Sequence, residues 1–140
     1  MKRSVIFMAL CLWSVLACAK APTGMWTTYD DKTGKKRSQM KLSLDDNKIL
    51  TGRVVRVYPQ HGDTGICKAC PGEFKDKPIQ GLQILWGLTE HETGSWTGGE
   101  ILDPKSGRIY SVKLIQKGDK LYVRGFLGVS LLGRTQVWKR

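Results

Sequence analysis

The chain has 140 residues, with 23 Lys and Arg against 12 Asp and Glu and a formal net charge of +11 at pH 7. Its length suits one ordinary domain and leaves no room for a second sizeable core. A hydrophobic share of 41% and a charged share of 25% exclude a disordered, collagenous or fibrous chain, and four cysteines are too few for a small disulfide-built scaffold.

Residues 1–19 have the pattern of an export signal. A short basic start precedes an apolar run, 5–17, that contains no charged residue. The run is too short to cross a bilayer as a helix but suits the hydrophobic region of a signal peptide. We therefore expect residues 20–140 to form a single domain in the periplasm or outside the cell.

The cleavage point is open between two patterns. The small-x-small triplet 17–19 would release a soluble chain that starts at Lys20. The residues that end at Cys18 also resemble a bacterial lipobox, in which Cys18 is lipidated, becomes the first residue and anchors the protein to the outer membrane. Either cut removes Lys2 and Arg3, so the formal net charge falls from +11 to +9. Such a surface favours anionic partners, which after export are lipid head groups, lipopolysaccharide phosphates or acidic glycans rather than nucleic acid.

Short β-rich segments separated by turn residues fill the rest of the chain, and no helical periodicity is present. Asp, Asn, Pro and Gly lie between the segments because they tolerate or stabilise turn conformations. Short connections imply antiparallel neighbours, so an up-and-down meander is the simplest topology. We predict eight strands, at 24–30, 37–44, 48–58, 79–87, 94–102, 108–116, 120–127 and 133–139.

The strand at 120–127 is partly apolar on both faces. Tyr122, Arg124 and Phe126 share one side, opposite Leu121 and Val123. In a closed barrel one of these faces points into the lumen. A lumenal arginine would need a partner, because an unpaired buried charge is costly.

The long connection 59–78 holds the sharpest local motif, Cys67-Lys68-Ala69-Cys70. In an oxidising compartment, two cysteines at this spacing most simply form a disulfide that stiffens the loop. Thiol-redox enzymes also use the C-x-x-C spacing, but they place it at the start of a helix that the sequence does not predict here. Zinc is the third interpretation, with His61 and His91 completing a tetrahedral set, although the spacing fits no standard finger.

No other catalytic pattern is present. The sequence has no Gly-x-Ser-x-Gly, no His-Glu-x-x-His and no phosphate-binding Gly-x-x-x-x-Gly-Lys motif. We therefore expect a protein that is not an enzyme and that holds neither a metal nor a cofactor.

Aromatic residues are spread over most of the predicted strands, and most of them must build the core. Some could instead line the mouth of an eight-stranded barrel, which leaves space for one small ligand. The candidate ligand-binding residues are Trp86, Trp96, Tyr122, Arg124 and Phe126. Arg124 is the candidate anchor for an acidic head group.

The two ends of the predicted domain resemble a known pattern. Gly24-Met25-Trp26 on the first strand, with 134–140 on the last, is similar to the lipocalin or calycin barrel, in which an arginine from the end of the barrel covers the first-strand tryptophan. The resemblance implies an eight-stranded antiparallel barrel closed by these residues: Gly24, Trp26, Arg134, Trp138 and Arg140. Arg134 or Arg140 stacked on Trp26 would contribute roughly 1 kcal/mol.

Three longer motifs resemble one family within that class. They are Pro78-Ile79-Gln80-Gly81-Leu82, the run 98–104 continuing to Gly107 and Tyr110, and the run 121–128 with 132–136 and Trp138. Together they are similar to exported bacterial proteins grouped as domain of unknown function 2147. The resemblance covers nearly all of the domain and implies a secreted or periplasmic calycin-type barrel, with no reaction attached to it.

Three functional hypotheses follow from the sequence. The first is a non-enzymatic binder of a small apolar or amphipathic ligand in the barrel. The second is a structural or interaction protein of the envelope that docks on anionic components. The third is a thiol-redox or metal-dependent role for Cys67 and Cys70. The sequence does not determine the oligomeric state.

Overall fold

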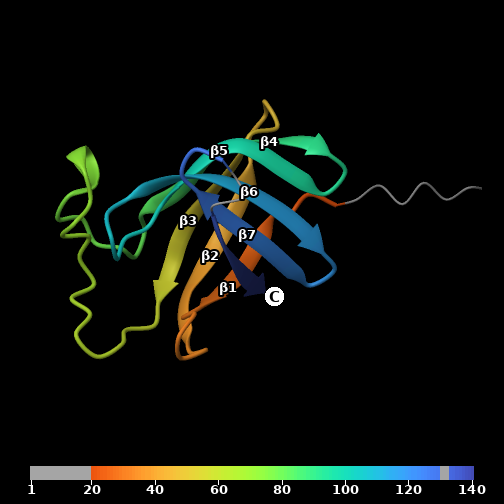
Figure 1. The fold of residues 1–140 in the computed structure, drawn as a ribbon. Helices are drawn as coiled ribbons and strands as arrows, with labels where there is room; N and C mark the ends of the chain where they lie inside the picture. The colour runs from red at the N-terminus through yellow and green to blue at the C-terminus, as the bar shows by residue number, and fades with distance from the viewer. Residues whose placement is uncertain (1–19, 130–132) are drawn as a thin grey trace, which may run out of the picture.

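The structure is a computed structural model that describes residues 20–129 and 133–140. The predicted export segment, with the candidate lipidation site Cys18, lies outside these residues. Eight strands form a closed antiparallel barrel in chain order, as predicted, and β8 closes the sheet against β1 (Figure 1). The strands are β1 Gly24–Tyr29, β2 Lys36–Leu44, β3 Leu50–Val57, β4 Gln83–Glu92, β5 Ser95–Leu102, β6 Ile109–Lys117, β7 Lys120–Phe126 and β8 Arg134–Lys139. Among the described residues, no helix has the length and hydropathy needed to cross a membrane.

The largest difference from the predicted strands is at β4. Residues 79–82 are not part of it: Gly81, with φ +92°, lies in a turn before β4, although Gly81 and Leu82 still share backbone hydrogen bonds with Val54 of β3. At its other end β4 continues through Glu90 and Glu92, which pair with β5. The predicted strand ended at 87, but β4 continues as an exposed strand through Glu92, and the turn is confined to Thr93 and Gly94.

The lumen of the barrel is packed with side chains. Trp26, Trp96 and Trp138 are each no more than 2% exposed, and leucine, valine and methionine side chains from neighbouring strands fill the space around them. In β6 and β7 the buried positions alternate with partly exposed ones, as expected for a sheet with one face on a core. The interior is therefore a core in which the tryptophans occupy much of the volume.

The first and last strands are joined at one end of the barrel. The guanidinium of Arg140 lies 4.2 Å from the ring centre of Trp26 and donates a hydrogen bond of 3.0 Å to the carbonyl of Thr23. The indole N–H of Trp26 donates to Pro22 at 2.9 Å. Gly24 opens β1 with φ +102°, a conformation that suits glycine.

Of the two arginines considered for this position, Arg140 is the one that lies on Trp26. Arg134 instead forms an ion pair of 3.3 Å with Asp31, in the β1–β2 turn. Trp138 is buried, and its indole N–H donates to Gln136 at 3.4 Å.

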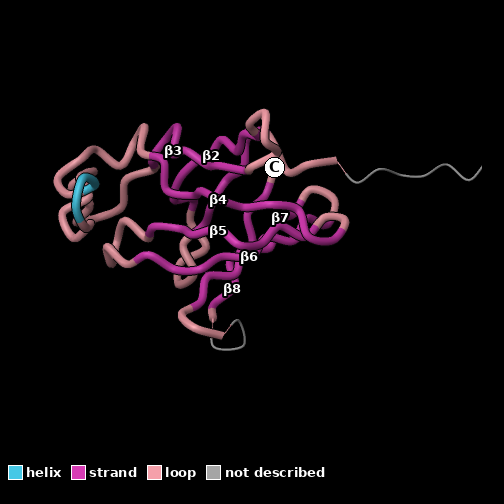
Figure 2. The backbone as a smooth tube through the Cα atoms, turned by 90° about the horizontal axis from the view of Figure 1, so that it is seen from above, coloured by secondary structure: helices cyan, strands magenta, loops and turns pink. Residues whose placement is uncertain are grey.

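The β3–β4 connection forms a folded lobe beside the barrel, with a short 3₁₀ helix, η1 Gly72–Phe74 (Figure 2). Cys67 and Cys70 form a disulfide, and both are almost fully buried. Backbone hydrogen bonds from Cys67 to Lys77 and from Ile79 to Gly65, of 2.8 and 2.9 Å, tie the two halves of the lobe together. We call residues 65–79 the disulfide lobe.

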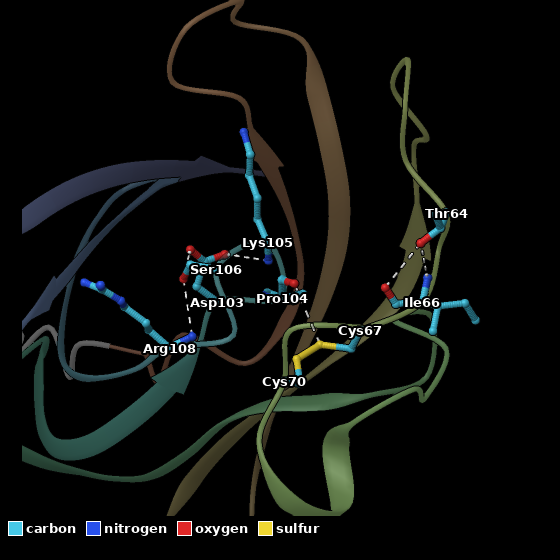
Figure 3. The surroundings of a disulfide bond; sticks show 9 residues. All are labelled: Thr64, Ile66, Cys67, Cys70, Asp103, Pro104, Lys105, Ser106 and Arg108. Atoms are coloured by element: carbon cyan, nitrogen blue, oxygen red, sulfur yellow. Dashed lines mark hydrogen bonds between the residues drawn. A yellow bond between two sulfur atoms is a disulfide. The ribbon is translucent and has the colours of Figure 1, made fainter.

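The disulfide lobe packs against β4 and the β5–β6 turn. The sulfur of Cys67 lies 3.8 Å from the carbonyl oxygen of Pro104 (Figure 3). Phe74 stacks on Trp86 with ring centres 6.0 Å apart. Ile84 and Leu102 point away from the lumen, opposite to their neighbours in the ladder, yet are buried. The lobe therefore supplies a second layer that covers the outer face of β4 and β5.

Candidate binding face

The structure does not bring the five candidate ligand-binding residues together in the barrel mouth. Trp96 lies inside the core, with an indole N–H that has no partner among the described residues. Trp86 lies on the outer face of β4 beneath Phe74. The other three, on β7, face outward. Four of the five therefore do not line the lumen, and the fifth, Trp96, fills part of it.

The reason lies in the pleat of β7. Leu121 and Val123 are buried in the lumen, so the alternating positions face the outside of the sheet. Tyr122, Arg124 and Phe126 are half-buried there. Both faces carry enough apolar surface that the sequence alone did not distinguish them.

On this outer face, β7 lies between β6 and β8 in regular register. Tyr122 pairs with Ile115 on one side and Val137 on the other. Arg124 pairs with Lys113 and Thr135, and its guanidinium donates a hydrogen bond of 2.9 Å to the Thr135 hydroxyl. Because paired residues share a face, these side chains form one continuous surface.

A concavity of about 280 Å³ opens on this surface. Its lining combines three cationic side chains with an aromatic ring, an aliphatic side chain and a hydroxyl: Lys113, Ile115, Lys117, Tyr122, Arg124 and Thr135. The ammonium of Lys117 lies 5.4 Å from the centre of the Tyr122 ring. We call these six residues the outer groove.

A second concavity of about 500 Å³ adjoins the outer groove and shares Lys113 with it. It lies over an irregular stretch of β5, where Gly98 has φ +81° and the pairing with β6 shifts between Trp96 and Gly99. Phe126 and Glu100 are among its lining residues. A bulge of this kind leaves bare backbone at the surface, which deepens the hollow beside Lys113.

The sequence analysis found Tyr122 and Arg124 but missed the other four residues of the outer groove. The alternation in 111–117 could have located Lys113, Ile115 and Lys117, because it places them opposite the buried Val112 and Leu114. Thr135 carried no comparable signal, because only the cross-strand register brings it beside Arg124.

Charge is distributed unevenly around the barrel. Strands β6, β7 and β8 carry lysines and arginines but no aspartate or glutamate, and the same holds for β2 and β3. The acidic residues within strands lie on β4 and β5, at Glu90, Glu92 and Glu100. An anion is therefore attracted to the β6–β8 side and repelled from the β4–β5 side.

The residues considered for redox or metal chemistry lie elsewhere. Cys67 and Cys70 are bonded to each other, and His61 and His91 are exposed in separate parts of the fold. Among the described residues, no three His, Cys, Asp or Glu side chains gather in a group that could hold a metal ion. The outer groove contains the groups needed to hold an anion against an apolar surface.

Among the described residues, Asp30 has a pKa that departs clearly from its ordinary value. Backbone N–H groups of Thr33 and Lys32 donate to the carboxylate of Asp30 at 2.8 and 2.9 Å. The Thr33 hydrogen bond is the main cause that holds the pKa of Asp30 below its ordinary value. This residue stabilises the β1–β2 turn.

Comparison with known proteins shows a family match and a structural match. A bacterial family described as "Uncharacterized protein conserved in bacteria (DUF2147)" matches residues 24–140. A solved structure from Helicobacter pylori, described as protein HP1028 that "belongs to the lipocalin family", is similar with a TM-score of 0.71 and 19% sequence identity. The match covers 84% of this chain and 81% of that one, and at this identity it shows the shared lipocalin-like fold. No curated protein matches the sequence.

Proposed function

The chain belongs to the bacterial DUF2147 family, and from that premise we propose that it is an exported, non-enzymatic protein that binds a small anionic amphiphile in the outer groove. The lipocalin-like fold is compatible with small-ligand binding. The proposal moves that binding from the lumen, where the sequence analysis expected it, to the outside of the sheet.

The observation that carries the proposal is the composition of the outer groove. Lys113, Lys117 and Arg124 surround Ile115 and Tyr122 with no acidic side chain in the lining. Charge-assisted hydrogen bonds from Arg and Lys suit a carboxylate or phosphate. The half-buried ring and aliphatic side chain suit the apolar part of the same molecule.

Packing of the lumen favours this location over the interior. A ligand inside the barrel would have to displace large side chains that are at most 2% exposed, such as Trp26 and Trp96. Large-to-small changes in such a core typically cost about 3–5 kcal/mol, so displacement of those rings would also be costly. The outer groove needs no such rearrangement.

Decyl phosphate and decanol, which share one apolar tail, test the proposal by isothermal titration calorimetry. We expect Arg124→Met to lower the affinity for decyl phosphate about tenfold, because one charge-assisted hydrogen bond is lost, and to leave the affinity for decanol unchanged. Lys113→Met is a second variant with the same expectation. Lys41→Met, an exposed lysine on β2, is the matched control for loss of one charge.

Two results would refute binding in the outer groove. One is that Arg124→Met, while unfolding like the wild type, lowers the affinity for both ligands equally. The other is that Lys41→Met lowers the affinity for decyl phosphate as much as Arg124→Met does. Binding that is lost in a folded Trp96→Phe variant, but not when residues of the groove are changed, would show that the ligand lies in the lumen.

A second candidate is docking on an anionic surface of the envelope. Its supporting observation is that the basic character extends beyond the groove to β2 and β3, where Lys41 and Arg53 are direct cross-strand partners. Sedimentation with phosphatidylglycerol vesicles separates the two candidates. Docking of this kind would fall with both Lys41→Met and Arg124→Met and would fall steeply with salt.

A further inference from the structure

The outer face of β6, β7 and β8 is organised in rows that cross the strands. Three successive outward positions on each strand pair with those of its neighbours. The first cationic row is Lys113, Arg124 and Thr135; the apolar row is Ile115, Tyr122 and Val137; and the second cationic row is Lys117, Lys120 and Lys139. The outer groove includes members of all three rows.

The two cationic rows have a fixed separation. Lys113 and Lys117 are four residues apart on one strand, and a strand rises about 3.3 Å per residue, so the backbone positions of the two rows lie about 13 Å apart, within which the flexible lysine stems can move their charges. The apolar row runs midway between them, with its three side chains half-buried. A molecule that spans the groove therefore meets positive charge, then an apolar surface, then positive charge again.

The rows place like charges directly opposite each other. Lys113 pairs with Arg124, and Lys120 pairs with both Lys117 and Lys139. Direct cross-strand pairs of like charge destabilise a sheet. Asp119, in the turn between β6 and β7, is the acidic residue nearest in sequence to the second row, and the strands themselves contribute none. Bound anions would relieve this repulsion in each row.

From this arrangement we infer that the ligand is a bis-phosphorylated amphiphile, with one phosphate at each cationic row and its apolar middle on Ile115, Tyr122 and Val137. This inference rests on the proposed anion binding in the outer groove and specifies its ligand class. Arg124, with the Thr135 hydroxyl beside it, presents donors suited to a phosphate with several acceptor oxygens. Lys117 and Lys120 of the second row act as point charges for the other phosphate, whereas the ammonium of Lys139 lies 5.2 Å from the centre of the Tyr29 ring on β1.

A series of α,ω-bisphosphates measures the row spacing directly. Butane-1,4-, octane-1,8- and dodecane-1,12-bisphosphate are titrated into the protein, expressed with its own N-terminal segment, in a buffer free of phosphate. Octyl phosphate is the reference with one head group. We expect affinity to peak at octane-1,8-bisphosphate, whose extended length matches the row spacing, and to exceed that of octyl phosphate by about tenfold or more.

Two single-row variants test the assignment of each phosphate. Arg124→Met and Lys117→Met should each reduce octane-1,8-bisphosphate binding to the level of octyl phosphate, whereas Lys41→Met should not. Without ligand, Lys113→Met should unfold at a higher temperature than the wild type, because it removes one of a repelling pair. This gain in stability, accompanied by weaker binding, separates a binding role for Lys113 from a structural one.

The possible failures are distinguishable. If octyl phosphate binds and depends on Arg124, but no bisphosphate binds more tightly, the two-phosphate inference fails and the proposed function stands. An affinity that rises steadily with chain length, or that falls equally with Lys41→Met, also overturns the inference. If neither octyl phosphate nor any bisphosphate binds, the inference and the proposed function both fail.

Discussion

Substitution of Gly107 tests how the disulfide lobe is held against the barrel. Gly107 lies in the β5–β6 turn with φ +72°, and a Cβ built there would collide with the carbonyl of Ala69 in the lobe. The β1–β2 turn provides a matched control, because Gly34 has φ +69° and its Cβ would meet open space. The two turns share the same backbone hydrogen bond of 2.8 Å, from the glycine N–H to the carbonyl of Asp103 or Asp30.

The expected magnitudes follow from these two environments. Alanine in the left-handed region costs about 1 kcal/mol, which is the whole effect expected of Gly34→Ala. Gly107→Ala must also displace the lobe from its contact with the turn. The lobe covers Leu102, and exposing a side chain of that size costs about 2 kcal/mol. We therefore expect Gly107→Ala to lower the free energy of unfolding by about 3 kcal/mol in total.

Tryptophan fluorescence follows both variants, in guanidinium unfolding for the free energy and in thermal unfolding for the melting temperature. The expected melting temperatures fall by about 4 °C for Gly34→Ala and about 12 °C for Gly107→Ala. Equal losses in the two variants, within about 0.5 kcal/mol, would refute the reasoning, because they would show that contact between the lobe and the turn adds nothing to stability.

Three further predictions concern the lobe, the strand closure and acid stability. Because the disulfide is buried, we expect dithiothreitol to reduce it slowly in the native protein and faster in Gly107→Ala, as measured by thiol labelling and mass spectrometry. Arg140→Gln should lower the free energy of unfolding by about 1 kcal/mol, because the contact with the Trp26 ring is lost. Arg134→Gln removes a largely exposed ion pair with Asp31 and should change the free energy of unfolding by less than about 0.5 kcal/mol in the same denaturation assay. Asp30 has a lowered pKa in the folded protein, so its contribution to folding stability is present above its unfolded pKa of about 3.9 and is lost as the pH falls through the folded pKa. An NMR titration should place the midpoint of Asp30 below about 3.9. Asp30→Asn should make the free energy of unfolding less dependent on pH in the acid range.

The strand order was predictable because turn chemistry marks most of the connections. Both Asp-initiated turns, 30–34 and 103–107, contain a glycine where the backbone needs positive φ, and both join neighbouring antiparallel strands. The end of β4 was misplaced because Glu90 and Glu92 are polar residues in an exposed strand, where no apolar alternation distinguishes a strand from a turn.

The candidate site was less predictable because it depends on which face of β7 is buried. Leu121 and Val123 lie on one face and Tyr122, Arg124 and Phe126 on the other, so each face carries two apolar side chains and neither is clearly the buried one from the sequence. In the structure Leu121 and Val123 are buried in the lumen, and Tyr122 and Arg124 face outward. Register across β6 and β8 then determines their partners, and such long-range pairing has no local signature in the sequence.

The two sides of the barrel are covered unequally, and this asymmetry favours a binding role for the β6–β8 face. On β4 and β5, outward apolar side chains such as Leu102 are sealed beneath the disulfide lobe. On β6, β7 and β8, no described segment covers Ile115, Tyr122 and Val137, which stay half-buried between two rows of cations. A sheet selected only for stability gains little from like charges placed opposite each other beside apolar surface. An anionic ligand with an apolar middle accounts for both features at once, because it neutralises the rows and covers the side chains between them.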